Sequence, residues 1–169
     1  ATPRELFPHY VMRGLAHSAF QEYEAAYADY CTIDSLLATE VDATDPSRIQ
    51  LQALTGGVCI KLKRYEEAEQ RYKRHARPTA ETYGEYCQNH IEAINYMANA
   101  EGFAGNLDAA CRHLTLAMEK MTELIKKQLP HKGMKDRDAA WERISKLMTD
   151  MTPFAIKAGK VQTDFTRLC

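Results

Sequence analysis

The chain has 169 residues, of which 45% are hydrophobic, and a formal net charge of −1. This balance gives no electrostatic reason to expect nucleic acid or an anionic membrane as a partner. No apolar run approaches the roughly 20 residues of a membrane-spanning helix, and the first residues lack the pattern of a signal peptide. The length fits one domain, although Ala1 in place of a Met is compatible with a processed chain or a piece of a longer one.

Capping signals and helical spacing of apolar residues predict helices throughout. Thr2, Pro3 and Glu5 supply a cap, a proline at the first helical position and a capping-box carboxylate, and Asp45-Pro46 and Thr152-Pro153 repeat the first two. Alternation typical of strands is nowhere sustained. The expected helices lie near 3–20, 23–40, 46–62, 65–76, 80–104, 107–128, 136–151 and 153–167. The sequence therefore predicts an all-α fold of about four antiparallel hairpins.

One pattern of side chains occurs three times, and a constant 42-residue step relates the copies. Each copy has a small residue, a polar turn, a large apolar residue, an alanine three positions further on and a second large apolar residue. The copies are Gly14, Tyr23, Ala26 and Tyr30; Gly56, Tyr65, Ala68 and Tyr72; and Ala98, Leu107, Ala110 and Leu114. A fixed period of this length indicates stacked supersecondary units of one kind.

The small residues lie on both sides of turns expected at Gln21-Glu22, Lys63-Arg64 and Gly105-Asn106. Small side chains let two antiparallel helices approach closely, so each copy predicts a helical hairpin. Phe20 and Leu62, with the repeated large residues, are expected to fill the space around this close contact.

These residues resemble the tetratricopeptide repeat family, most closely from Lys63 to Tyr72 and more loosely from Gly105 to Ala110. The family's early Trp is absent, and His17, Cys59 and Glu101 replace its first-helix Tyr. Because the usual period is shorter, at about 34 residues, the 42-residue step resembles the long-helix variant of kinesin light chains. Over residues 5–128 the resemblance implies a right-handed α-solenoid. Residues 1–128 would form three hairpins, and 129–169, which lack the small-residue signature, a capping hairpin.

The resemblance also implies an inner surface lined by the first helix of each hairpin. Its inward positions select Val11 and Leu15 from copy one, Gln50, Ala53 and Ile60 from copy two, and Glu92, Asn95 and Asn99 from copy three. Two asparagines four residues apart share a helix face and can each donate and accept hydrogen bonds to the backbone of a bound peptide. Solvated helix positions are the alternative interpretation of this pair.

The family's carboxylate clamp, in which inward Lys and Arg hold a C-terminal carboxylate, is not supported. Val11, Ala53 and Glu92 stand where cations would be needed. The sequence instead predicts a groove that is apolar at one end and polar at the other, suited to a segment with hydrophobic anchors. Basic residues between Lys126 and Arg137 are expected to be a solvated loop, with docking of an acidic partner as the alternative.

Five cysteines without a Cys-x-x-Cys pair are expected to be reduced thiols. Cys87 and His90 could form half of a zinc site, but no second pair is evident, so no metal or other cofactor is expected. No nucleotide-binding, hydrolase or metalloprotease motif occurs. His17 and His75 fall on packed positions of the repeat and are expected to be structural.

The predicted function is therefore a non-enzymatic, cytoplasmic scaffold that binds a protein or peptide in the inner groove. The candidate contacts are Asn95, Asn99, Gln50, Glu92, Val11, Leu15 and Ile60. The alternative is a structural or oligomerisation module of a larger protein. Exposed apolar surface in the groove would favour the first function, and an exposed outer or terminal patch the second.

Overall fold

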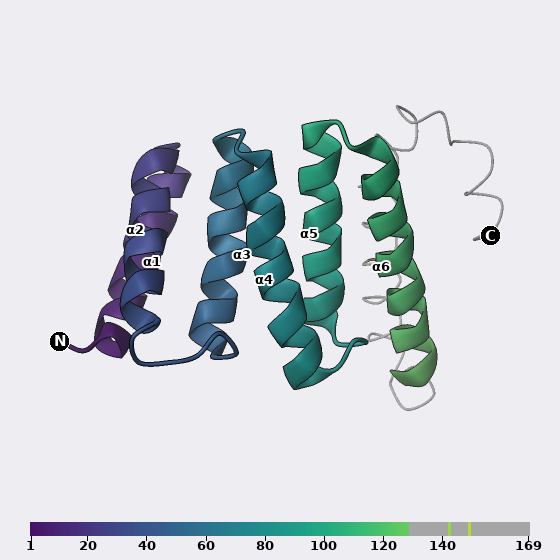
Figure 1. The fold of residues 1–169 in the computed structure, drawn as a ribbon, viewed down its shortest axis with the longest axis horizontal. Helices are drawn as coiled ribbons and strands as arrows, with labels where there is room; N and C mark the ends of the chain where they lie inside the picture. The colour runs from purple at the N-terminus through teal and green to yellow at the C-terminus, as the bar shows by residue number, and fades with distance from the viewer. Residues whose placement is uncertain (129–141, 143–148, 150–169) are drawn as a thin grey trace.

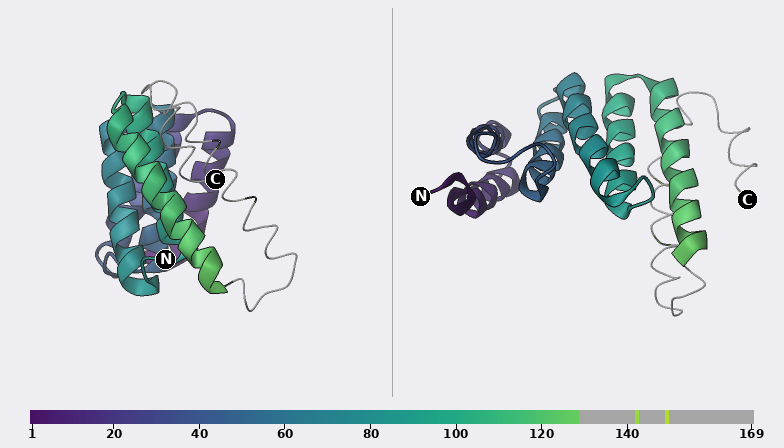
Figure 2. Two further views of the ribbon diagram at one scale, coloured as in Figure 1. Left: turned by 90° about the vertical axis from the view of Figure 1, so that its right-hand side faces the viewer. Right: turned by 60° about the horizontal axis from the view of Figure 1, so that its bottom comes forward.

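The computed structural model describes residues 1–128 together with positions 142 and 149, and all of the helices and strands that it describes are α-helices. They are α1 (Pro3–Ala19), α2 (Tyr23–Leu37), α3 (Pro46–Lys61), α4 (Tyr65–Tyr83), α5 (Gln88–Ala104) and α6 (Leu107–Gln128). Consecutive helices pair as three antiparallel hairpins that stand side by side in chain order (Figure 1). Viewed along the row, α6 crosses obliquely in front of the earlier helices, so successive hairpins are turned relative to one another (Figure 2). The fold is an α-solenoid.

The predicted 42-residue step sets where the helices begin. Tyr23, Tyr65 and Leu107 open the second helices, and Pro46 and Gln88 open α3 and α5. The predicted capping box at Thr2 and Glu5 is formed, and the Asp45 side chain accepts a hydrogen bond from the Ser47 N–H.

Each hairpin turns through one residue in the left-handed region of backbone conformation. Gln21, Lys63 and Gly105 have φ values of 64°, 61° and 88°. The N–H of the next residue then donates back to a carbonyl five positions earlier, as at Glu22 (2.8 Å), Arg64 (2.8 Å) and Asn106 (2.9 Å). These are the bonds of a Schellman motif, which normally places glycine at the left-handed position. Only the third copy has that glycine.

The close helix approach predicted at the small residues is confirmed. A Cβ atom built on Gly14 would lie 2.4 Å from the Tyr30 ring, and one on Gly56 would lie 2.8 Å from the Tyr72 ring. Both rings are buried, and the repeated alanines Ala26, Ala68 and Ala110 have no exposed surface. The glycine in one helix therefore makes room for the tyrosine in the other.

A continuous core joins the hairpins. One cluster of buried residues combines α1 and α2 with Leu51 and Val58 of α3, and the next combines Cys59 of α3 with residues of α4, α5 and α6. Since α3 contributes to both clusters, the first two hairpins cannot separate without exposing apolar surface.

The predicted boundary between the fourth and fifth helices is wrong. The helix expected over 65–76 continues as α4 through Pro78 to Tyr83 and stops at Gly84, whose φ is 87°. Pro78 lies inside α4 and is buried, so packing outweighs the missing N–H. The expected helix 80–104 accordingly begins only at Gln88.

A second correction concerns Phe20. Its side chain was expected to fill the space at the helix contact but is 78% exposed at the end of α1. The expected capping hairpin over 129–169 lies outside the described residues, apart from positions 142 and 149. Within the described part of the chain, none of the helices combines the length and apolar character needed to cross a membrane.

Candidate functional site

The first helices of the hairpins, α1, α3 and α5, carry large apolar side chains at equivalent positions. The 42-residue step relates Met12 to Leu54 and Leu54 to Tyr96. Met12 is 66% exposed and Tyr96 39%, while Leu54 is partly buried. Leu15 and Phe103, at nearby positions of α1 and α5, are 43% and 56% exposed. We call the surface formed by α1, α3 and α5 the inner face.

A shallow cavity of about 280 Å³ lies on the inner face between α3 and α5. It brings together two predicted site residues, Gln50 and Glu92, with the predicted inward residue Ala53. The remaining lining residues are Pro46, Ile49, His75, Asn89 and Tyr96. The cavity therefore spans the junction between the second and third hairpins, as the alignment of inward positions implies.

His75 of α4 belongs to the lining of this cavity. The imidazole is buried, and its Nδ1 atom lies 2.9 Å from the carbonyl oxygen of Ile49. A carbonyl oxygen can only accept, so this contact assigns the proton of the neutral ring to Nδ1 and leaves Nε2 as an acceptor. At the rim, Glu92 Oε1 accepts from Gln88 Nε2 at 2.7 Å. With the Glu92 carboxylate beside it, the cavity favours a group that donates hydrogen bonds or carries positive charge.

Tyr96 is held in place by the repeat itself. Its ring stacks on that of Tyr72, with the centroids 5.2 Å apart. Tyr72 in turn packs against Gly56, and its burial raises the pKa of its phenol. Contacts from Gly56 to Tyr72 and from Tyr72 to Tyr96 thus link the small residue of the repeat to an exposed aromatic ring on the inner face.

Of the other predicted site residues, all but Leu15 are buried or half-buried. Val11 and Asn95 are each 7% exposed, Ile60 and Asn99 are half-buried, and Leu15 is exposed. Ile60 packs against the larger core cluster. Two of the predicted site residues, Gln50 and Glu92, line the cavity, whose exposed lining residues are Gln50, Asn89 and Tyr96.

Sequence reasoning missed His75, Tyr96 and Met12 as surface features of the inner face. A signal for two of them was available, because Met12 and Tyr96 occupy the same position of the 42-residue step with large apolar side chains. His75 was assigned to a packed position, which the structure confirms, and its second ring nitrogen was not considered.

Several ionisable groups in or near the interior are engaged in pairs. Asp29 accepts from the Arg13 guanidinium at 2.6 and 2.7 Å, and Glu101 lies 2.7 Å from His113 Nδ1. Cys87 and His90, the conceivable half of a zinc site, are the cap and first turn of α5, where the His90 N–H donates to Cys87 Sγ. No cluster of three or more side chains suited to a metal occurs among the described residues.

No protein-family model matches the sequence, and no curated protein is similar to it at a significant level. Solved structures, however, share the fold. BtubC (BKLC) from P. vanneervenii superposes with a TM-score of 0.80 at 16% identity, over 96% of this chain and 60% of that one. The chain has the tetratricopeptide-like repeat fold.

Kinesin-light-chain-type repeats show the same architecture. A Podosopora anserina putative kinesin light chain with nearly identical repeats of this type, and a single-residue variant of it, each match with a TM-score of 0.60 at 10% identity. Both alignments cover 94% of this chain and 98% of the other. The predicted repeat architecture is thereby confirmed.

Proposed function

We propose that the chain is a non-enzymatic adaptor that binds a peptide or protein segment along its inner face. The observation that carries the proposal is the exposure of Met12 and Tyr96, which occupy equivalent positions in the first and third repeats, with Tyr96 in the lining of the cavity between α3 and α5. Large apolar groups exposed at equivalent positions of a repeat array supply anchor points to an extended or helical ligand. The repeat fold of the comparison structures supports a scaffold, and a cytoplasmic location is part of the same proposal.

The chemistry of the cavity defines the ligand further. Apolar side chains would contact Met12, Leu15 and Tyr96, and a lysine, arginine or other donor would enter the cavity toward His75 and Glu92. Of the residues expected from sequence, Gln50 and Asn99 would contact the ligand backbone. Val11, Ile60 and Asn95 would support these contacts from below.

The first hairpin argues against the alternative function, a structural or oligomerisation module, in the form of assembly through the end of the solenoid. Copy two carries Leu51, which packs with the first hairpin, and the buried Thr55, whereas copy one carries His9 and Arg13 at the equivalent positions. Both are exposed, and Arg13 is bound to Asp29 within the same hairpin. A polar end of this kind suits a solenoid terminus and not a stacking surface. The proposal of ligand binding is therefore preferred.

Peptides selected from an array by the full chain provide the test. Titration calorimetry would compare the unaltered protein with the double variant Met12→Glu/Leu15→Glu. The control is Leu36→Glu/Leu116→Glu, which makes the same kind of change at exposed positions of α2 and α6. We expect at least about a tenfold loss of affinity from the first variant, since carboxylates would be buried against apolar anchors. Equal affinity of the two variants, or selection of no peptide at all, would refute the proposal.

A further inference from the structure

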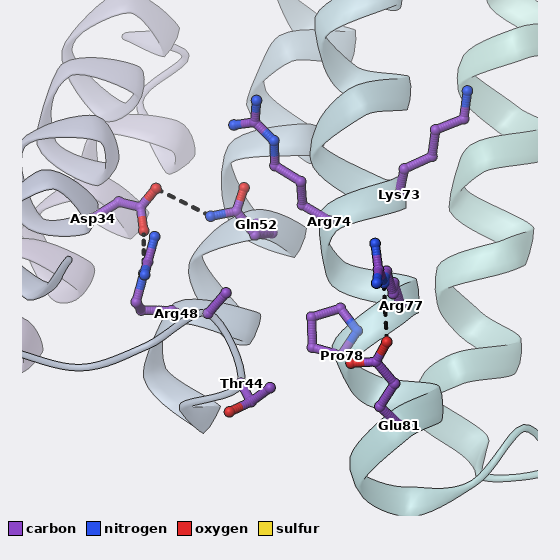
Figure 3. Close-up of a pocket in the computed structure, with 10 residues that line it drawn as sticks. Asp34, Thr44, Arg48, Gln52, Lys73, Arg74, Arg77, Pro78 and Glu81 are labelled. Atoms are coloured by element: carbon purple, nitrogen blue, oxygen red, sulfur yellow. Dashed lines mark hydrogen bonds and ion pairs between the residues drawn. The ribbon is translucent and has the colours of Figure 1, made fainter.

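A second cavity, of about 480 Å³, lies between α2 and α4 and is closed below by the connection between α2 and α3. Figure 3 shows Asp34 on one side, Arg48 and Gln52 of α3 behind, and Arg74, Arg77 and Pro78 of α4 on the other side. The volume falls within the range of ligand sites and exceeds what one small anion fills. None of these residues takes part in the inner-face cavity.

Hydrogen bonds hold the side of the cavity formed by Asp34, Arg48 and Gln52. Asp34 accepts from Arg48 Nε at 3.3 Å and from Gln52 Nε2 at 3.1 Å. Arg48 also donates to the carbonyl oxygen of Val41 at 3.3 Å. The side chains of Asp34 and Arg48 are only 15% and 21% exposed. The Asp34 carboxylate is thus already shared by several donors, and the guanidinium of Arg48 is fixed in position.

The rim carries positive charge that is weakly compensated. Arg77 pairs with Glu81 at 2.9 Å, but its side chain is 84% exposed, and an exposed pair of this kind contributes little. Arg74 is exposed and forms no ion pair with the residues that the structure describes. Lys73 pairs with Glu69 and extends away from Asp34 (Figure 3). Arg74 and Arg77 can therefore turn to a ligand at little cost.

We propose that this cavity binds a peptide segment of a protein partner that carries at least two aspartate or glutamate side chains. Guanidinium groups match carboxylates by paired N–H donors, which Arg74 and Arg77 can supply from α4, while Arg48 of α3 adds a fixed positive charge. Ala43 and Pro78 offer apolar contact to the peptide between its acidic side chains. Arg74 and Arg77 belong to α4, the second helix of its hairpin. They therefore do not occupy the inward positions that the carboxylate clamp of the tetratricopeptide repeat family uses. The chain would then hold two segments, with a donor-bearing one on the inner face and an acidic one between α2 and α4.

Fluorescence anisotropy of a fluorescein-labelled hexaglutamate peptide, titrated with the full chain at low salt, tests this site. Arg74→Glu and Arg77→Glu should each weaken binding at least about tenfold, because each replaces attraction with repulsion. The matched control is Arg112→Glu, the same reversal at an exposed position of α6, which should change affinity less than about twofold. The inner-face variant Met12→Glu/Leu15→Glu should also retain binding, which separates this site from the function proposed above.

Three results would overturn the proposal. The first is absence of hexaglutamate binding to the unaltered chain. The second is an equal loss in Arg112→Glu and Arg74→Glu, which would indicate attraction without a defined site. The third is displacement of the peptide by inorganic phosphate at a similar concentration, which would reduce the cavity to a site for small anions.

Discussion

Two adjacent glycines of α3 give opposite predictions for the same substitution. A Cβ on Gly56 would lie 2.8 Å from two atoms of the Tyr72 ring and 3.1 Å from a third. Carbon atoms prefer about 3.5–4.0 Å, and the ring cannot withdraw, because it is 3% exposed and stacked on Tyr96. For Gly57, the nearest atom is the Tyr72 hydroxyl oxygen at 3.8 Å, which is ordinary contact.

The expected magnitudes follow from these distances. Replacing a helical glycine by alanine gains about 1 kcal/mol of helix propensity in both cases. Gly56→Ala additionally overpacks the core, which costs about 1–3 kcal/mol. Gly57→Ala should therefore stabilise the protein by about 1 kcal/mol, and the two variants should differ by about 1–3 kcal/mol in the free energy of unfolding. At about 2–4 °C per kcal/mol for a chain of this size, the difference is measurable as a change in Tm.

A second substitution shows whether the clash with Tyr72 is the cause. The third copy carries Ala98 and Leu114 at the equivalent positions, so Tyr72→Leu should make room for the alanine of Gly56→Ala. Urea unfolding followed by circular dichroism would give a favourable coupling of about 1 kcal/mol or more between the two changes. Strict additivity in this cycle, or equal shifts from Gly56→Ala and Gly57→Ala, would refute the packing described for the repeat.

Three further predictions concern the turns, the thiols and the tyrosines. Lys63→Gly should raise the free energy of unfolding by roughly 0.5–1 kcal/mol, because Lys63 has a φ of 61°, and a lower urea midpoint would contradict this. A strong reductant should leave Tm unchanged, since Cys31, Cys59, Cys87 and Cys111 are free. Burial raises the pKa of the Cys59 thiol to about 12, so this thiol should be slow to alkylate at pH 8. The hydrogen bond to Glu67 raises the pKa of Tyr27 to about 12 from 10.0, so the folded state disfavours the phenolate, and stability should fall as pH rises from about 10 to 12. Tyr27→Phe should make this loss less steep, and an unchanged slope in denaturant titrations across that range would show that the bond is not formed.

The repeat step made most of the helix positions predictable from sequence. The helix starts at Tyr23, Pro46, Tyr65 and Leu107 agree with the structure because caps and turns are local signals. The start of α5 was missed because Pro78 suggests a break, and because a Cys at the cap is not a recognisable signal. Applied to Pro46, the 42-residue step gives Gln88, so the repeat was the better guide.

The candidate sites were less predictable, since they depend on contacts between hairpins. The inward positions of the family identified Gln50 and Glu92, which share the inner-face cavity. The exposure of Tyr96 depends on how its ring stacks on Tyr72 across a helix junction, which no local pattern encodes. Likewise, the cavity between α2 and α4 brings Arg48 and Arg74 together. In the sequence alone, each of these residues looks like an ordinary surface charge.

The central claim, ligand binding on the inner face, is tested most directly by NMR. Amide chemical shifts of the isotope-labelled full chain would be followed during titration with a peptide selected from the array. The account predicts that the largest changes fall on α1, α3 and α5, around Met12, Gln50 and Tyr96. Changes concentrated on α2, α4 and α6, with those three residues unmoved at saturation, would contradict it.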